Sequence, residues 1–262
     1  MDNNALLAFT ITFVAGASTA IGALAAFFVR KKDFKTIAFA MSFSAGVMIF
    51  VSFADIMPMS AELFGRGFSE TKAEAATFAM FFAGALIAGI IDRFVPEHIT
   101  TEMLDKSGVA KKTNVRKAAI MTSLALAVHN FPEGLSVFFS TLEDTRMGLA
   151  LGFAILLHNI PEGISVALPA YQSTGSRKKA FWLSTCSGLV EPFGALCAYF
   201  VFAPFLTPTL VGACMAITAG LMVYIALDEL LPMAKEYDEQ HSAIVGVFLG
   251  MAVIALSGIA TK

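Results

Sequence analysis

Long runs without a charged side chain constrain this chain more than any other feature of its sequence. No Asp, Glu, Lys or Arg occurs in residues 5–29, 36–54, 163–176, 192–227 or 242–261. A helix needs about 20 apolar residues to cross the roughly 30 Å hydrocarbon core of a bilayer. Charged residues make up only 15% of the chain, against about 25% in soluble domains. The runs are continuous, whereas membrane-barrel strands alternate over about ten residues, so the sequence predicts an all-α integral membrane protein.

Polar residues, Gly and Pro divide these runs into eight predicted membrane-spanning helices. They are expected at 5–29, 36–59, 74–94, 117–142, 147–170, 179–202, 206–233 and 242–261. The first run is too long, and lacks the basic flank, for a cleaved signal peptide. The polar segment at about 95–116 is the only long loop, and we expect it to be flexible. Residues 1–262 are therefore predicted to form a single transmembrane domain.

The orientation follows from the loop charges. The loops after predicted helices 1, 3, 5 and 7 hold 14 of the 18 Lys and Arg residues, and the other side holds Arg66, Lys72, Arg146 and Lys262. Cytoplasmic loops carry an excess of Lys and Arg. We therefore expect the loop at 95–116 in the cytoplasm, both termini outside, and a multi-pass location in the cell membrane.

Ionisable residues inside the predicted helices indicate a cation site. Each costs about 2.5–3.5 kcal/mol at the centre of a membrane helix. They are Asp55, His129, Glu133, His158, Glu162, Glu191, Asp228 and Glu229. No Lys or Arg falls at the same depth, so six carboxylates would repel one another in a medium of low dielectric constant. A divalent cation would remove that repulsion.

Two copies of one motif support this interpretation. HNFPEG occupies residues 129–134 and HNIPEG occupies 158–163. Residues i and i+4 share a helix face, so each copy places its His and its Glu together, at His129 and Glu133 and again at His158 and Glu162. Imidazole nitrogen and carboxylate oxygen together suit Zn, Fe, Mn and Ni. The adjacent amides of Asn130 and Asn159 would complete this site or form a second one beside it.

The prolines of the two copies fit the same reading. Pro132 and Pro161 have no N–H, so the carbonyls of Val128 and Leu157 lose their helical partners. Freed carbonyls are tolerated at membrane depth only where protein, water or an ion satisfies them. A single proline kink or a lone His is often structural, but two copies on consecutive helices favour a metal site. Cys186, Cys197 and Cys214 match no ligand spacing and are expected to be buried free thiols.

A weaker pattern suggests internal symmetry. ADIMP at 54–58 and LDELLP at 227–232 each place a carboxylate three residues before a proline, in predicted helices 2 and 7, which run in opposite directions. This predicts an inverted repeat of helices 1–3 and 6–8 around the central pair 4–5. Such repeats enclose substrate sites in transporters.

Taken with Glu191–Pro192 in predicted helix 6 and the eight-helix layout, the two motif copies make the chain resemble the ZIP family of divalent-metal transporters, and within it the bacterial members. The resemblance covers essentially the whole chain. It implies uptake of Zn²⁺, and often of Fe²⁺, Mn²⁺, Co²⁺ or Cd²⁺, into the cytoplasm, without a catalytic cofactor, and homodimers are plausible. Many members carry a His-rich loop between helices 3 and 4, whereas here that loop has only His98, so we expect no metal-sensing role for it.

The resemblance also implies a two-metal site between predicted helices 4, 5 and 6. The primary ligands it implies are His129, Glu133, His158, Glu162 and Glu191. Asn130 and Asn159 would serve the neighbouring site, with the three glutamates able to bridge. Asp55 matches a position of variable ligand type, and Asp228 and Glu229 would line the route on the cytoplasmic side.

Three other functions are compatible with parts of the pattern. An intramembrane metal-dependent hydrolase would use His and carboxylate ligands to activate water, but no separate base is evident. A passive cation channel or a transporter of organic cations would not need imidazole ligands, and a metal sensor would be expected to carry a signalling domain. The expected partners are divalent ions and the lipid bilayer, with no nucleic acid.

Overall fold

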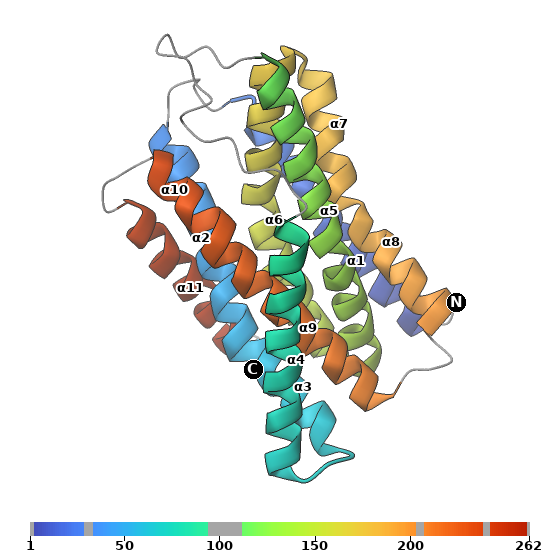
Figure 1. The fold of residues 1–262 in the computed structure, drawn as a ribbon. Helices are drawn as coiled ribbons and strands as arrows, with labels where there is room; N and C mark the ends of the chain where they lie inside the picture. Colours follow the sequence, from blue (N-terminus) through green and yellow to red (C-terminus); the bar gives the residue numbers. More distant parts are fainter. Residues whose placement is uncertain (1–2, 29–33, 94–111, 203–206, 238–241, 261–262) are drawn as a thin grey trace.

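A computed structural model describes residues 3–28, 34–93, 112–202, 207–237 and 242–260, and every regular element in these ranges is helical (Figure 1). In chain order the elements are α1 (Asn3–Ala25), α2 (Phe34–Val51), η1 (Ser52–Ile56), α3 (Met57–Gly65), α4 (Glu70–Asp92), α5 (Lys112–Glu143), α6 (Thr145–Thr174), α7 (Arg177–Gly188), α8 (Val190–Cys197), η3 (Ala198–Phe202), α9 (Pro208–Ile225), η5 (Ala226–Leu230), α10 (Leu231–Tyr237) and α11 (Ser242–Ala260). Helices satisfy their own backbone groups, which a lipid environment requires.

The helices confirm an all-α membrane protein. Five described segments are long and apolar enough to cross a bilayer: Asn3–Ala25, Ala38–Gly65, Glu70–Asp92, Thr145–Leu168 and Pro208–Lys235, with a shorter apolar helix at Ala243–Ile259. The two remaining predicted helices, 117–142 and 179–202, correspond to α5 and to the α7–α8–η3 segment. Helix α5 already begins at Lys112, so residues 112–116 of the expected loop are helical, while residues 94–111 lie outside the described ranges.

The helices pack as two groups. The central bundle consists of α1, α5, α6, α7 and α8, and the flanking bundle of α2, α3, α4, α9, α10 and α11. Within the flanking bundle, α2 packs on α11 and α4 packs on α9, and the two bundles meet where α2 contacts α6 and α9 contacts α5 (Figure 1). The turns after α3 and α5 are also joined, because Arg66 forms an ion pair with Glu143. In this ion pair Arg66 also donates a hydrogen bond to Glu143, and the hydrogen bond and the charge of the Glu143 carboxylate raise the pKa of the Arg66 guanidinium.

Two helices of the flanking bundle contain a π-helical turn. The turn η1 continues α2 and carries Asp55, and η5 continues α9 and carries Asp228 and Glu229. Each turn is followed by a short α-helix that contains the motif proline, Pro58 in α3 and Pro232 in α10. Such turns are rare and frequently mark functional sites.

Polar residues define both ends of α6. The Asp144 side chain accepts hydrogen bonds from the backbone N–H groups of Arg146 and Met147, which caps the helix start. Gly175 ends the helix with a φ of 67°, a left-handed conformation that favours glycine. The turn at Asp144 therefore joins α5 and α6 as neighbouring antiparallel helices.

The cysteines are free, as expected, but they are less buried than expected. Cys186 is exposed on α7, while Cys197 and Cys214 are half-buried. Apolar lipid solvates a thiol well, so a cysteine in a membrane helix need not face the protein interior.

Candidate metal centre

The two motif copies meet in the middle of the central bundle. Helices α5 and α6 pack against each other along their length, and each carries its HNxPEG copy near its centre. The exposed fractions of His129, Glu133, His158 and Glu162 are 3%, 0%, 0% and 1%. Four ionisable side chains from two helices are thus removed from the surface together.

These side chains pair across the two helices. The His129 Nε2 atom lies 3.4 Å from Glu162 Oε1, and the His158 Nε2 atom lies 3.5 Å from Glu133 Oε1. The sequence places His and Glu of one copy on the same face, and the structure adds that each His contacts the Glu of the other copy. The arrangement is reciprocal, so the two copies form one cluster.

Most ligating atoms of this cluster have no hydrogen-bond partner. Within the described residues, the buried side-chain atoms without one are His129 Nε2, Asn130 Oδ1, both oxygens of Glu133, both ring nitrogens of His158, Asn159 Oδ1, both oxygens of Glu162, Glu191 Oε2, and the hydroxyls of Thr19 and Thr185. Native proteins leave few buried polar groups unpaired, and each such group calls for an explanation. All but two of these atoms belong to the seven predicted ligands.

Glu191 joins the cluster through Asn159. The helical path breaks at Leu189, between α7 and α8, and Glu191 lies in the first turn of α8, fully buried. The Asn159 Nδ2 group donates to Glu191 Oε1, and it also donates to the Ala15 carbonyl oxygen at 2.9 Å. On the other helix, Asn130 Nδ2 donates to the Ser187 carbonyl oxygen at 3.0 Å. The amide oxygens of both asparagines remain free to act as ligands.

Hydroxyl groups from neighbouring helices support the backbone around the prolines. Ser44 Oγ donates to the His158 carbonyl oxygen at 3.2 Å, and Thr218 Oγ1 lies 3.4 Å from the Pro132 carbonyl oxygen. Ser18 Oγ donates to the Leu156 carbonyl oxygen at 3.1 Å. The carbonyls of Leu156 and His158 flank that of Leu157, which the sequence singles out, whereas the Pro132 carbonyl lies one turn after that of Val128. They supply the support that proline-interrupted membrane helices need.

The cluster contains buried negative groups without a basic neighbour. Among the buried residues that the structure describes there is no Lys or Arg, so only the imidazoles can balance Glu133, Glu162 and Glu191 from within. No group of three or more His, Cys, Asp or Glu side chains in the described ranges already has the spacing of a metal site. The cluster therefore consists of separate pairs, which a cation would have to draw together.

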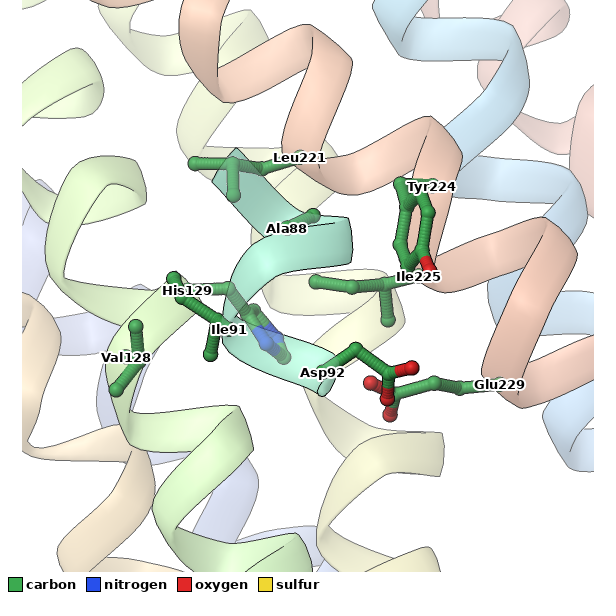
Figure 2. A pocket seen from close by; sticks show the side chains of 9 residues that line it. All are labelled: Ala88, Ile91, Asp92, Val128, His129, Leu221, Tyr224, Ile225 and Glu229. Carbon is green, nitrogen blue, oxygen red and sulfur yellow. The ribbon is translucent and has the colours of Figure 1, made fainter. Parts of the chain in front are cut away.

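A pocket connects His129 with further carboxylates. It is lined by Ala88, Ile91 and Asp92 of α4, Val128 and His129 of α5, Leu221, Tyr224 and Ile225 of α9, and Glu229 of η5. Figure 2 shows the His129 ring and the carboxylates of Asp92 and Glu229 pointing into it. Sequence reasoning missed Asp92 and Tyr224, although Asp92 falls inside the predicted helix 74–94 and is ionisable.

The other two predicted pathway residues lie on the π-helical turns. Asp55 is half-buried in η1, and Asp228 is exposed in η5, where it forms a hydrogen bond with Tyr224. The structure thus brings Glu229 into the pocket of His129. Asp55 and Asp228 do not line this pocket.

Comparison with known proteins decides the family. The sequence profile of the ZIP zinc transporters matches residues 96–258. The chain belongs to the ZIP family. The matched segment contains both motif copies, Glu191 and the whole of η5, and so includes every predicted site residue except Asp55.

Similar ZIP proteins cover the rest of the chain. A protein named zinc transporter ZupT from Nitratidesulfovibrio vulgaris is 45% identical, over 98% of this chain and 97% of its own length. The ZupT of Oceanobacillus iheyensis is 44% identical, and that of Chlorobium luteolum is 46% identical, each over 97% of this chain and 98% of its own length. These matches confirm the resemblance to bacterial ZIP proteins over nearly all residues.

Proposed function

We propose that this protein transports zinc into the cytoplasm, with the His129–Glu162 and His158–Glu133 pairs as the first metal site. The observation that carries the proposal is the reciprocal contact of the two pairs, with nearly all their ligating atoms unpartnered. Its similar proteins in three bacteria are named zinc transporters. Zinc is the substrate, and no catalytic cofactor is needed.

The spacing within the pairs supports this choice of ligands. In tetrahedral zinc sites the ligand atoms lie at about 2.0–2.2 Å from the metal, so two neighbouring ligands are about 3.3–3.6 Å apart. The nitrogen–oxygen distances of 3.4 and 3.5 Å fall in that range. A direct N–H···O hydrogen bond is shorter, at about 2.7–3.2 Å. Ligands of this type also suit iron, manganese, cobalt and cadmium, which we propose as further substrates.

Asn130, Asn159 and Glu191 would form the neighbouring site. Asn159 already contacts Glu191, and both asparagine oxygens are unpartnered. Glu133 and Glu162 each offer two unpartnered oxygens, so they can bind an ion in either site. A cation can thus pass from one site to the next without leaving a carboxylate.

The route to the cytoplasm would follow the pocket of His129. It runs from His129 to Asp92 in the last turn of α4 and Glu229 in η5. The charge of the loops predicts that this end of α4 faces the cytoplasm. Carboxylates along this path replace part of the hydration that an ion loses. Asp55 and Asp228 are proposed to act at the margins of the same pathway.

We infer an inverted repeat, with eight spans and both termini outside, and the contacts of the flanking bundle support the repeat. Asp55 and Glu229 are separated along the chain by the same number of residues as Pro58 and Pro232. The same separation holds for Ser44 and Thr218 and for the starts of η1 and η5. Ser44 contacts the α6 copy of the motif and Thr218 the α5 copy. We infer that the flanking bundle supports the site symmetrically and that movement between the two bundles gives alternating access.

Zinc uptake by proteoliposomes tests the proposed function. Purified protein in sealed vesicles is expected to give saturable uptake of radiolabelled zinc that exceeds the leak of protein-free vesicles. Zinc binding without uptake would contradict transport. If the bound zinc then supported hydrolysis of a substrate, the hydrolase alternative would replace it.

Acidification is expected to weaken zinc binding and uptake. The imidazoles and carboxylates must lose their protons to bind zinc, and free imidazole gains its proton near about pH 6.5. Each proton that zinc must displace lowers the apparent affinity by up to about tenfold per pH unit below the relevant pKa. Equilibrium dialysis with labelled zinc between pH 8 and pH 5 measures this loss. Affinity that stays constant across this range would exclude the histidines as ligands.

A further inference from the structure

The contacts of α1 with α6 repeat those of α7–α8 with α5. Asn159 donates to the Ala15 carbonyl oxygen, and Asn130 donates to the Ser187 carbonyl oxygen. Along the chain, Ala15 and Ser187 are the same number of residues apart as Thr19 and Glu191. Thr19 on α1 therefore occupies the position that Glu191 occupies on α8.

Close backbone packing confirms this correspondence. A Cβ at Gly163, which follows Glu162, would clash with the Thr19 carbonyl oxygen, and a Cβ at Gly134, which follows Glu133, would clash with the Glu191 carbonyl oxygen. The side chains correspond as well. A Cβ at Gly188 would clash with the side chain of Thr19, and a Cβ at Gly16 would come within 3.2 Å of the Glu191 Cβ.

The Thr19 hydroxyl has no partner in the described structure. Thr19 is 2% exposed, and its Oγ1 atom is buried without a hydrogen bond. Elsewhere on α1, by contrast, Thr12 Oγ1 donates to the Ala8 carbonyl oxygen one turn back. On the opposite helix Asn130 Oδ1 is also unpartnered. Glu191 accepts a hydrogen bond from Asn159. By the correspondence above, Thr19 and Asn130 are the equivalent residues, and each has an unpartnered side-chain oxygen.

We propose that Thr19 is a positioning residue for the transported cation, at the end of the site opposite Glu191. Its hydroxyl and the Asn130 amide oxygen hold the hydrated divalent ion as it leaves the carboxylates. This inference rests on the proposed transport function and adds a residue to it. An ion bound only by carboxylates leaves slowly, and conduction needs sites weak enough to release it. Two neutral oxygens provide such a site on one side of the cluster, and Glu191 provides a charged one on the other.

The test compares Thr19→Val with Thr19→Ser in the zinc uptake assay. Valine keeps the shape of threonine but removes the hydroxyl, so the maximal uptake rate is expected to fall about tenfold, a loss typical of outer-shell partners of metals. The zinc Kd from equilibrium dialysis should stay unchanged, because the His and Glu ligands are intact. Serine keeps the hydroxyl and should retain the native rate.

Thr185→Val is the matched control, because Thr185 is the other buried threonine with an unpartnered hydroxyl in the described ranges. It should keep the native rate. If Thr19→Val also keeps that rate and melts at a higher temperature, its hydroxyl is merely an unsatisfied packing group and the inference fails. Equal losses in Thr19→Val and Thr19→Ser would assign the effect to packing and would likewise overturn it.

Two further comparisons keep the test decisive. Should Thr19→Val not fold, Thr19→Ala replaces it, because alanine and serine both fit and differ only in the hydroxyl. The native protein and Glu162→Ala are measured alongside. The inference alone is overturned if the native protein shows saturable uptake, Glu162→Ala abolishes it, and the Thr19 variants keep the native rate. If the native protein shows no uptake, the proposed function is overturned as well.

Discussion

Replacing Glu162 with alanine is expected to abolish saturable zinc uptake, and replacing His129 should have the same effect. Each change removes one proposed ligand and leaves its partner, 3.4 Å away in the native protein, buried without a counterpart. Losing even an outer-shell partner costs a metal site about 10–100-fold, so losing a direct ligand should remove uptake within the detection limit. Radiolabelled zinc uptake into proteoliposomes provides the measurement.

The reciprocal pairing gives this experiment a sharper form. Breaking a buried pair by removing one partner destabilises a protein by about 3–5 kcal/mol, while removing both partners costs much less. The double variant of His129 and Glu162 should therefore melt at a higher temperature than either single variant, although it transports nothing. Glu70→Gln, at an exposed glutamate of α4, controls for loss of a carboxylate. Native uptake in the single variants would show that the cluster is structural.

Replacing Gly163 with alanine is expected to prevent folding. In a helix interior, alanine is normally more favourable than glycine by about 1 kcal/mol. At Gly163 the new Cβ would collide with the Thr19 carbonyl oxygen, and a backbone atom cannot move aside as a flexible side chain can. Overpacking of side chains alone costs about 1–3 kcal/mol, and separating α1 from α6 would also break the Asn159–Ala15 hydrogen bond.

The matched control for this change is Gly258→Ala in α11. A Cβ at Gly258 meets nothing within 4 Å, so this variant should be at least as stable as the native protein. Size-exclusion chromatography and thermal unfolding in detergent measure both variants. A monodisperse Gly163→Ala protein with native melting temperature would contradict the close approach of α1 and α6.

Much of the site follows from the sequence because its elements are local. The uncharged runs fix the helical class, and the i, i+4 spacing within each motif copy correctly brings His129 and Glu133, or His158 and Glu162, to the same region of a helix. The sequence does not reveal that each His contacts the Glu of the other copy. That pairing depends on the relative rotation and height of α5 and α6, which periodicity within one helix does not encode.

Residues contributed by distant helices were harder to predict. Asp92 lies in the last turn of α4, next to Arg93, where a carboxylate normally suggests a solvated helix end. Thr19 is an ordinary threonine in an apolar run, and only its place opposite Gly163 and Gly188 distinguishes it. The boundary of α5 was misplaced because residues 112–116, which include Lys112 and Arg116, extend the helix beyond its apolar section.

The π-helical turns η1 and η5 give the helices that contain them, α2 and α9, a second helical register, in which the turn is α-helical. A π-turn holds one residue more than an α-turn closed by the same backbone, and each residue of an α-helix rotates its side chain by about 100°. If η5 converted to an α-helix, the register of the helix after it would shift by one residue. The Glu229 side chain would then rotate away from the pocket that it shares with His129. Asp55 in η1 would turn in the same manner. The carboxylates of η1 and η5 thus sit on the segments of their helices that can change direction by a shift of register, without any helix unfolding.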